Sequence, residues 1–202
     1  MLTVLTLPNF LTLLRIVAIP FFLILLGDQS YRWALAVFVA AGITDGLDGA
    51  IARLTHTKTT VGAFLDPAAD KALLVSAFIA LGFMEAVPRW LLVIVVSRDA
   101  VIVLGYFLLF VITQQTMEVQ PTVSGKASTA LQLLSVSLVL VGLIDAQLVP
   151  VRVQQAAFYA TGTVTTLAGL QYMYRGLGWL QRQGERPAVT PGAGDDRDRR
   201  RA

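Results

Sequence analysis

The stretch from Asp45 to Asp70 reads DGLDGAIARLTHTKTTVGAFLDPAAD, and apolar sequence lies on both sides of it. It contains four carboxylates, those of Asp45, Asp48, Asp66 and Asp70. An aspartate at membrane depth costs about 2.5–3.5 kcal/mol on insertion scales, so such residues are rare and mark functional sites. The sequence supplies few basic residues nearby to neutralise them. We therefore interpret this acidic stretch, residues 45–70, as functional.

Both halves of the acidic stretch have the spacing of helices. The first half places five residues on one helix face, at i, i+3, i+4, i+7 and i+8: Asp45, Asp48, Gly49, Ala52 and Arg53. The second half places three residues on one face, at i, i+4 and i+8: Gly62, Asp66 and Asp70. The threonine-rich turn Leu54–Val61 separates the halves. Two helices joined by so short a turn are antiparallel neighbours, so we expect the acidic faces to meet near the turn.

Converging carboxylates form a hard, oxygen-lined and strongly negative site. Such ligands suit Mg²⁺, Mn²⁺ or Ca²⁺, whereas Zn²⁺ and Cu⁺ prefer His or Cys. The chain has no cysteine, and its single histidine, His56, lies in the polar turn, where we interpret it as a solvated residue. Two divalent ions can clamp the attacking and leaving oxygens of a phosphoryl transfer. The residues alone thus predict metal-assisted chemistry on a phosphate at the membrane surface.

The pattern D-x2-D-G-x2-A-R-x8-G-x3-D-x3-D, which runs from Asp45 to Asp70, resembles a family signature. It is similar at every fixed position to that of the CDP-alcohol phosphatidyltransferases. The resemblance implies a six-helix membrane enzyme. We expect its active site at the cytoplasmic ends of helices 2 and 3. Such an enzyme takes CDP-diacylglycerol, or a related CDP-alcohol, and releases CMP as an acceptor hydroxyl attacks the β-phosphorus.

The resemblance also implies roles for the matching positions. Asp45, Asp48, Asp66 and Asp70 would bind two metal ions, Mg²⁺ or Mn²⁺, and Asp70 would be the catalytic base. The CDP moiety would contact a second set of residues: Asp48, Gly49, Ala52, Arg53 and Gly62. The chemistry of these residues agrees, because small side chains let a bulky headgroup approach the backbone and a guanidinium can grip a pyrophosphate through its planar fork.

Composition places the rest of the chain in a membrane. Of 202 residues, 55% are hydrophobic and 14% are charged, with a mean hydropathy of +0.68, whereas soluble domains carry about 25% charged residues. We expect an all-α integral membrane protein with six transmembrane helices: Leu7–Gly27, Trp33–Leu54, Val61–Ala86, Trp90–Thr113, Ser128–Ile144 and Val151–Leu170. Residues 1–182 would form the membrane domain and residues 183–202 a disordered, charged tail.

The distribution of basic residues predicts the orientation, because cytoplasmic loops carry an excess of Lys and Arg. One side of a six-span chain holds Arg53, Lys58, Lys126, Arg175, Arg182 and Arg186. The other side holds Arg32, Arg89 and Arg152. This bias predicts a multi-pass protein of the cell membrane with both termini and the acidic stretch facing the cytoplasm. The net charge of +3 is too small to indicate a nucleic-acid partner.

Three cations outside the acidic stretch are hypothetical contacts for the phosphate of the acceptor. Lys126 ranks first, because a cation near the start of the fifth span opposes the helix dipole unless an anion binds there. Arg98 and Arg15 are the other two. Each has a simpler interpretation: Lys126 as a loop residue that follows the positive-inside bias, Arg98 as the ion-pair partner of Asp99, and Arg15 as a side chain that snorkels to the interface.

Two further expectations concern the neighbours of these residues. Lys71 follows Asp70 and lies about 100° round the helix from it, and we interpret it as a charge partner that offsets part of the acidic site. At the start of the fifth span, Lys126, Thr129 and Gln132 occupy positions i, i+3 and i+6. They are expected to share much of one helix face.

The acceptor stays open between two branches of the family. The pattern from Pro8 to Arg15 resembles the phosphatidylglycerophosphate synthases, which use glycerol-3-phosphate. Thr44, just before the acidic stretch, and Pro67 and Lys71, near its end, resemble that branch as well. The sequence from Pro121 to Gln132 is more similar to the CMP-forming cardiolipin synthases, which use phosphatidylglycerol. Inositol phosphate or serine is an alternative acceptor. The expected partners are therefore CDP-diacylglycerol, a glycerol-type acceptor and the lipid bilayer; homodimers are common in the family, although nothing in the sequence marks a dimer face.

Two non-enzymatic classes of protein compete with a transferase. A cation transporter also needs intramembrane carboxylates that bind metal, but it does not explain why Gly49, Ala52 and Arg53 share the acidic face. A membrane scaffold held by ion pairs would need more cations than Arg53, Lys58 and Lys71 provide for the aspartates. We therefore expect a transferase.

Overall fold

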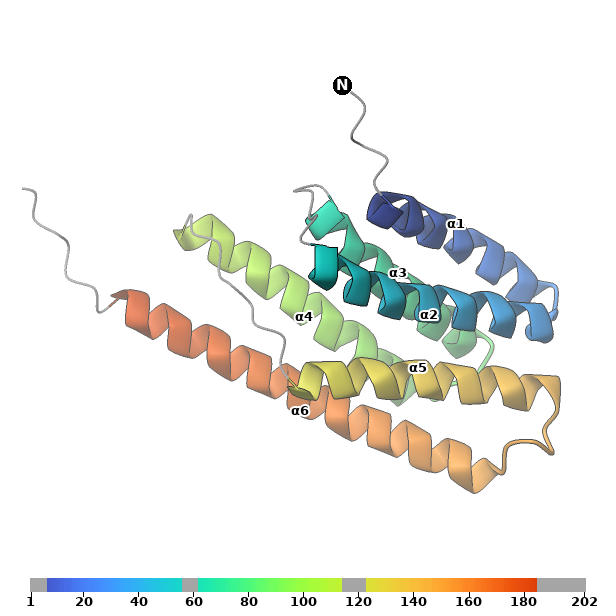
Figure 1. Ribbon diagram of the computed structural model, residues 1–202. Helices are drawn as coiled ribbons and strands as arrows, with labels where there is room; N and C mark the ends of the chain where they lie inside the picture. The colour runs from blue at the N-terminus through green and yellow to red at the C-terminus, as the bar shows by residue number, and fades with distance from the viewer. Residues whose placement is uncertain (1–6, 56–61, 114–122, 185–202) are drawn as a thin grey trace, which may run out of the picture.

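The computed structural model describes residues 7–55, 62–113 and 123–184, with side chains for residues 14–44, 71–105 and 123–178. This described chain consists of six α-helices without a strand (Figure 1): α1 Leu7–Gly27, α2 Tyr31–Thr55, α3 Gly62–Phe83, α4 Arg89–Thr113, α5 Val123–Ile144 and α6 Val151–Gly184. The all-α class and the six helical segments are thus confirmed for these residues. The turn with His56 and Lys58 lies outside the described residues, as do Arg186 and the rest of the predicted tail beyond Gly184.

Two helices are longer than the apolar segments that predicted them. α5 begins at Val123 rather than Ser128, so that Lys126 lies inside its first turn instead of just before the helix. α6 continues past Leu170 to Gly184 and includes Arg175 and Arg182. The predicted bounds followed apolar runs, whereas a helix continues for as long as its backbone hydrogen bonds do, and these extend into polar sequence.

Two helices end in the same type of turn at the end of the bundle away from the acidic stretch. After α1, Gln29 adopts a φ of 57°, and the backbone N–H of Ser30 donates to the carbonyl of Leu25 at 2.9 Å. After α3, Glu85 adopts the same φ of 57°. A residue in the left-handed backbone conformation, together with a backbone hydrogen bond between residues five positions apart, is a common cap at a helix C-terminus. It satisfies carbonyl groups that would otherwise lack a hydrogen-bond donor. These tight turns make α1 antiparallel to α2 and α3 antiparallel to α4.

Successive helices alternate in direction, so one end of the bundle collects the starts of α1, α3 and α5 and the ends of α2, α4 and α6 (Figure 1). α1 packs on α2 and α3, α4 packs on α3 and α6, and α5 packs on α2 and α6. The two halves of the acidic stretch occupy adjoining ends of α2 and α3. This topology brings residues from all six helices toward the acidic end.

The described apolar core lies in the half of the bundle away from the acidic stretch. Its largest fully buried side chains come from five helices: Phe22, Phe38, Phe78, Leu81, Leu91 and Leu140. The rings of Phe22 and Phe38 tilt against each other with centroids 5.7 Å apart. Buried polar side chains lie nearer the acidic end, and they include Arg15, Asp99, Ser128, Gln132 and Thr165. The interior therefore changes from apolar to polar along the bundle axis.

The outer surface of the bundle is rich in large apolar side chains. Trp33, Val93, Leu104 and Tyr174 are each more than 60% exposed, and soluble proteins rarely expose extended apolar surface of this kind. Among the described side chains, however, only α5 forms a helix long and apolar enough to cross a membrane; the apolar helical stretches Leu14–Gly27, Tyr31–Thr44 and Lys71–Phe83 are shorter. Six membrane spans therefore remain a prediction.

Candidate active site

The signature residues occupy the end of α2 and the start of α3, two helices that follow one another in the chain. Asp45, Asp48, Gly49, Ala52 and Arg53 lie in the last turns of α2, and Gly62, Asp66 and Asp70 lie in the first turns of α3. This confirms the predicted pair of helices on either side of the turn. The side chains at positions 45–70 lie outside the described side chains, so the predicted metal, base and CDP contacts of these residues stay predictions. The start of α3 is also the positive end of a helix dipole, which favours an anion there.

The donor set at this end of the bundle fits a hard divalent cation. Four carboxylates on two adjoining helix ends offer oxygen ligands only, which suit Mg²⁺ or Mn²⁺ and not Zn²⁺. Within the described side chains there is no other group of three or more His, Cys, Asp or Glu residues that could hold a metal ion. The acidic stretch is therefore the candidate metal site that the sequence predicts.

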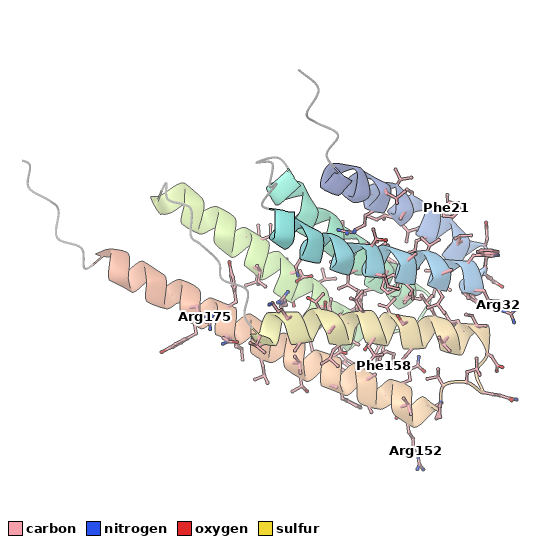
Figure 2. All side chains as sticks on the ribbon, viewed as in Figure 1. Phe21, Arg32, Arg152, Phe158 and Arg175 are labelled. Carbon is pink, nitrogen blue, oxygen red and sulfur yellow. The ribbon has the colours of Figure 1, made fainter. Side chains whose placement is uncertain are left out.

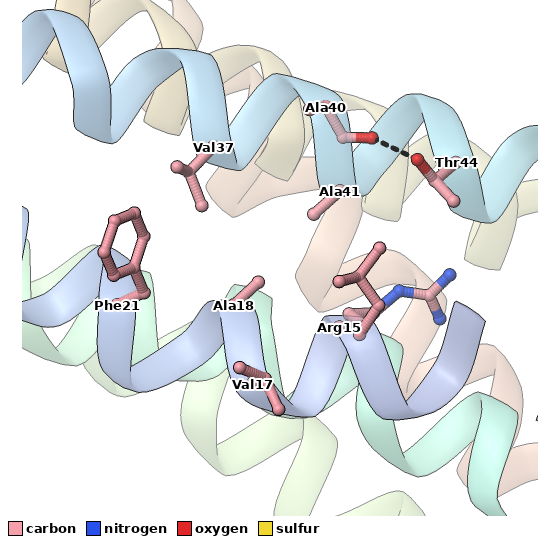
Figure 3. Close-up of a pocket in the computed structure, with 9 residues that line it drawn as sticks. Arg15, Val17, Ala18, Phe21, Val37, Ala40, Ala41 and Thr44 are labelled. Atoms are coloured by element: carbon pink, nitrogen blue, oxygen red, sulfur yellow. Dashed lines mark hydrogen bonds between the residues drawn. The ribbon is translucent and has the colours of Figure 1, made fainter. Parts of the chain in front are cut away.

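A groove between α1 and α2 leads toward the acidic stretch (Figure 3). Its volume is about 280 Å³, and its walls are almost entirely apolar: Leu14, Val17, Ala18 and Phe21 from α1 and Val37, Ala40 and Ala41 from α2. Arg15, only 5% exposed, and Thr44 close the end nearest Asp45. The hydroxyl of Thr44 donates to the carbonyl of Ala40 at 2.7 Å. The groove therefore has apolar walls and a basic side chain, that of Arg15, at the end beside the signature.

Three charged residues form a cluster between α3 and α4. The Nζ of Lys71 donates to Oδ1 of Asp99 at 2.5 Å, and Nη1 of Arg98 donates to the same oxygen at 2.6 Å. The side chains of Lys71, Arg98 and Asp99 are 33%, 10% and 8% exposed. We call these three residues the Asp99 cluster. The predicted Arg98–Asp99 ion pair is confirmed. The sequence predicts Lys71 as a charge partner of the acidic site, whereas the structure gives it Asp99 as a partner.

The Asp99 cluster also touches α6. A Cβ added to Gly169 would lie 3.3 Å from Cγ of Arg98, so the arginine stem crosses α6 where that helix has no side chain. Nε of Arg98 and Oδ2 of Asp99 are buried and have no hydrogen-bond partner within the described residues. A buried N–H donor of this kind is suited to a bound anion, which keeps Arg98 a candidate contact for the acceptor phosphate.

Hydroxyl and amide groups join α5 to α6. The hydroxyls of Ser128 and Thr165 lie 2.9 Å apart, and Nε2 of Gln132 donates to Thr165 at 3.1 Å. The predicted common face of Lys126, Thr129 and Gln132 is wrong: Gln132 is completely buried against α6, whereas Lys126 is exposed. Residues six apart differ by about 240° round a helix, which is enough to separate a buried face from an exposed one.

A family model described as CDP-alcohol phosphatidyltransferase matches residues 5–168, a range that includes both halves of the acidic stretch. The chain belongs to the CDP-alcohol phosphatidyltransferase family. A cardiolipin synthase (CMP-forming) of Streptomyces coelicolor is 38% identical over 49% of this chain and 49% of its own length. A CDP-diacylglycerol–glycerol-3-phosphate 3-phosphatidyltransferase of Bacillus subtilis is 32% identical over 82% of this chain and 92% of its own length.

Relatives of both predicted branches thus occur among the matches. A probable cardiolipin synthase (CMP-forming) of Drosophila melanogaster is 35% identical over 84% of this chain and 57% of its own length. The chain spans about half the length of the first curated relatives that it matches. The family is established, and the relatives carry names from two branches that differ in the acceptor.

Sequence reasoning found the charged residues of the Asp99 cluster but not all of their contacts. Arg98 and Asp99 stand out as adjacent charges within an apolar helix, and this signal predicted their ion pair correctly. Asp99 as the partner of Lys71 was missed, because these residues are 28 positions apart in the sequence. The α1–α2 groove was missed as well, because an apolar stretch of sequence does not show whether its side chains line a groove or pack in a core.

Proposed function

We propose that the protein transfers a phosphatidyl group from CDP-diacylglycerol to the hydroxyl of a glycerol-type acceptor, releasing CMP. One observation supports this above all: the complete signature of the CDP-alcohol phosphatidyltransferases lies on two adjoining helix ends. The names of the relatives in S. coelicolor and B. subtilis refer to CMP formation and to glycerol-3-phosphate as acceptor. The product in either case is an anionic glycerophospholipid.

In the proposed reaction, the acceptor oxygen attacks the β-phosphorus of the donor, the phosphorus that carries the diacylglycerol group. A new P–O bond forms as the bond from this phosphorus to the oxygen bridging to CMP breaks, and CMP leaves with that oxygen. Asp70 takes the proton of the hydroxyl as general base. The guanidinium of Arg53 holds the pyrophosphate, and the small residues Gly49 and Ala52 let the nucleotide approach α2.

Asp45, Asp48, Asp66 and Asp70 are the residues that would hold Mg²⁺ or Mn²⁺. When bound, such ions neutralise charge on the pyrophosphate and on the leaving CMP. The two halves of the acidic stretch come from different helices, so the cation would also draw α2 and α3 together. We expect metal removal by a chelator to abolish CMP release and Mn²⁺ or Mg²⁺ to restore it.

The groove between α1 and α2 supports a lipid donor. It is open along one side and apolar, as an acyl chain requires, and Arg15 stands at the end beside the signature, where a phosphate would lie. Lys126 and Arg98 would contact the phosphate of the acceptor from α5 and α4. Glycerol-3-phosphate and phosphatidylglycerol both carry such a phosphate, so these contacts suit either acceptor.

The proposal includes a membrane location with the acidic end facing the cytoplasm. Trp33, Trp90 and Tyr159 are exposed aromatic residues toward the opposite end, where amphipathic rings favour a membrane interface. Figure 2 shows Arg32 and Arg152 at that opposite end and Arg175 toward the acidic end. Cytoplasmic nucleotides would reach the acidic stretch directly in this orientation.

The decisive experiment measures CMP release from CDP-diacylglycerol by purified protein in detergent, with Mg²⁺ or Mn²⁺ present. Glycerol-3-phosphate and phosphatidylglycerol are offered separately, and Asp70→Asn serves as the inactive control. Release with glycerol-3-phosphate alone assigns a phosphatidylglycerophosphate synthase, and release with phosphatidylglycerol alone assigns a cardiolipin synthase. If neither acceptor supports metal-dependent CMP release, both assignments are contradicted. Inositol phosphate and serine would then be tested as acceptors. Metal transport into vesicles without any CMP release would overturn the transferase.

A further inference from the structure

We propose that Asp99 is a positioning residue that holds the ammonium group of Lys71 away from the metal-binding carboxylates. This inference rests on the proposed function, because it concerns the same metal site. It assigns a task to α4, a helix that carries none of the signature residues.

Lys71 is the residue next to Asp70, one of the predicted metal ligands. It lies in the first half of α3, and its flexible four-carbon stem carries a compact, rotatable charge. An ammonium group that pairs with a carboxylate occupies a ligand that a metal ion needs and also repels that ion. In the structure Nζ of Lys71 instead contacts Oδ1 of Asp99 on α4, at 2.5 Å.

Asp99 has a second cation partner besides Lys71. Arg98, its neighbour in the sequence, already donates to Oδ1 of Asp99 at 2.6 Å, so one cation balances the buried carboxylate. Both cations converge on Oδ1, whereas Oδ2 is buried without a hydrogen-bond partner among the described residues. The second cation makes the Asp99 cluster positive overall. The residue that gains a fixed position from this contact is therefore Lys71.

Stability alone is a weak reason for such an arrangement. The desolvation of buried charges often exceeds their mutual attraction, and a well-packed apolar cluster of similar volume is commonly at least as stable. Arg98 and Asp99 are about nine-tenths buried, and Lys71 is two-thirds buried. A role in keeping the neighbouring carboxylates available gives this charged cluster a function that an apolar cluster could not perform.

The test measures Mn²⁺ binding to the full-length protein in detergent without substrate, from the electron paramagnetic resonance signal of free Mn²⁺. Asp99→Asn keeps the shape of the side chain and releases Lys71, and we expect the Kd for Mn²⁺ to rise at least about tenfold, the effect usual for residues that support metal ligands. Lys71→Gln should leave the Kd unchanged, because Lys71 is held away from the site in the wild type. The double variant Asp99→Asn/Lys71→Gln should recover the wild-type Kd. Glu85→Gln, which removes the exposed ion pair with Arg89 at the other end of the bundle, is the matched control.

A merely structural Asp99 gives a different pattern. Asp99→Asn would then lower the melting temperature without changing the Kd for Mn²⁺, and this result would overturn the inference. Failure of the double variant to recover binding would overturn it too. Where Asp99→Asn does not fold, Lys71→Gln alone decides: an unchanged Kd supports the inference, and a shift above threefold in either direction contradicts it. Absence of Mn²⁺ binding in the wild type would overturn the proposed metal site itself, whereas normal wild-type binding with an unchanged Asp99→Asn variant would overturn this inference only.

Discussion

At the scale of single residues, burial determines whether a basic side chain is accessible to a bound phosphate. Arg98 is held by Asp99 and packs on α6, whereas Lys126 is exposed in the first turn of α5. An exposed cation near a helix start is unfavourable for the dipole unless an anion binds beside it. Of these two candidate contacts, Lys126 is therefore the more accessible to a soluble or membrane-borne phosphate.

The first prediction concerns Lys126. Lys126→Ala should raise the KM for the acceptor about tenfold, since a hydrogen bond to a charged group contributes about 1.5 kcal/mol or more. The KM for CDP-diacylglycerol and the Kd for Mn²⁺ should not change. Arg175→Ala, at an exposed position on α6, is the control for a general loss of positive charge. Weaker Mn²⁺ binding in Lys126→Ala would count against the acceptor role.

At the scale of helices, two close approaches hold α4 against α6. The indole of Trp90 lies over Gly162 and stacks on Tyr159 with ring centroids 5.4 Å apart, and Arg98 lies over Gly169. A Cβ added to Gly162 would lie 2.6 Å from Cζ3 of Trp90, which is closer than side chains tolerate. The helix pair thus depends on glycines for its spacing rather than for backbone freedom.

The second prediction follows from this spacing. Gly162→Ala should lower the free energy of unfolding by about 1 kcal/mol, because Trp90 must leave its stack on Tyr159. Gly105→Ala meets nothing within 4 Å and should be neutral or stabilising, since alanine favours helix by up to about 1 kcal/mol. Thermal unfolding in detergent, followed by tryptophan fluorescence, measures both variants. Equal melting temperatures for the two would contradict the close packing of α4 on α6.

The third prediction concerns the groove between α1 and α2. Ala41→Phe should fill the groove and lower kcat/KM for a long-chain donor about tenfold or more, because a headgroup displaced by about 1 Å can lose about 100-fold in rate. A water-soluble donor with short acyl chains should be affected much less. Val93→Phe, on the exposed face of α4, adds similar bulk elsewhere. A uniform loss with both donors would show that the groove does not hold an acyl chain.

At the scale of the whole molecule, polarity is graded along the bundle axis. Aromatic and aliphatic side chains fill one half, and charged and hydroxyl side chains lie inside the described part of the other half. Such a gradient suits a protein that is anchored by one half and reacts with polar substrates at the other. In the proposed membrane location, the polar half of the bundle would be the half that carries the acidic stretch.

The fourth prediction concerns orientation. The chain has no cysteine, so single cysteines report topology without background labelling. A membrane-impermeant maleimide should label Ala146→Cys, between α5 and α6, in intact cells, and should label Thr57→Cys, between α2 and α3, only after permeabilisation. Variants that retain CMP release are compared, so that misfolded protein is excluded. The reverse labelling pattern would place the acidic end outside and contradict the cytoplasmic orientation.

The sequence by itself determined the helices and the family. Apolar runs and turn residues act over a few neighbouring positions, as backbone hydrogen bonds from i to i−4 do, so all six helical segments could be predicted. The signature from Asp45 to Asp70 fits within one helical hairpin, and its spacing therefore also carried the candidate metal site and the resemblance. Where a helix is apolar on every side, however, the sequence does not indicate which face turns inward.

Only the tertiary structure decided which residues meet across helices. It places Gln132 and Lys126 on different faces of α5. It pairs Lys71 with Asp99, a contact that the sequence did not predict, and it shows a groove between α1 and α2. These outcomes depend on the rotation of each helix about its axis and on close approaches at glycines such as Gly169. Both are set by packing among distant segments, which local spacing cannot encode.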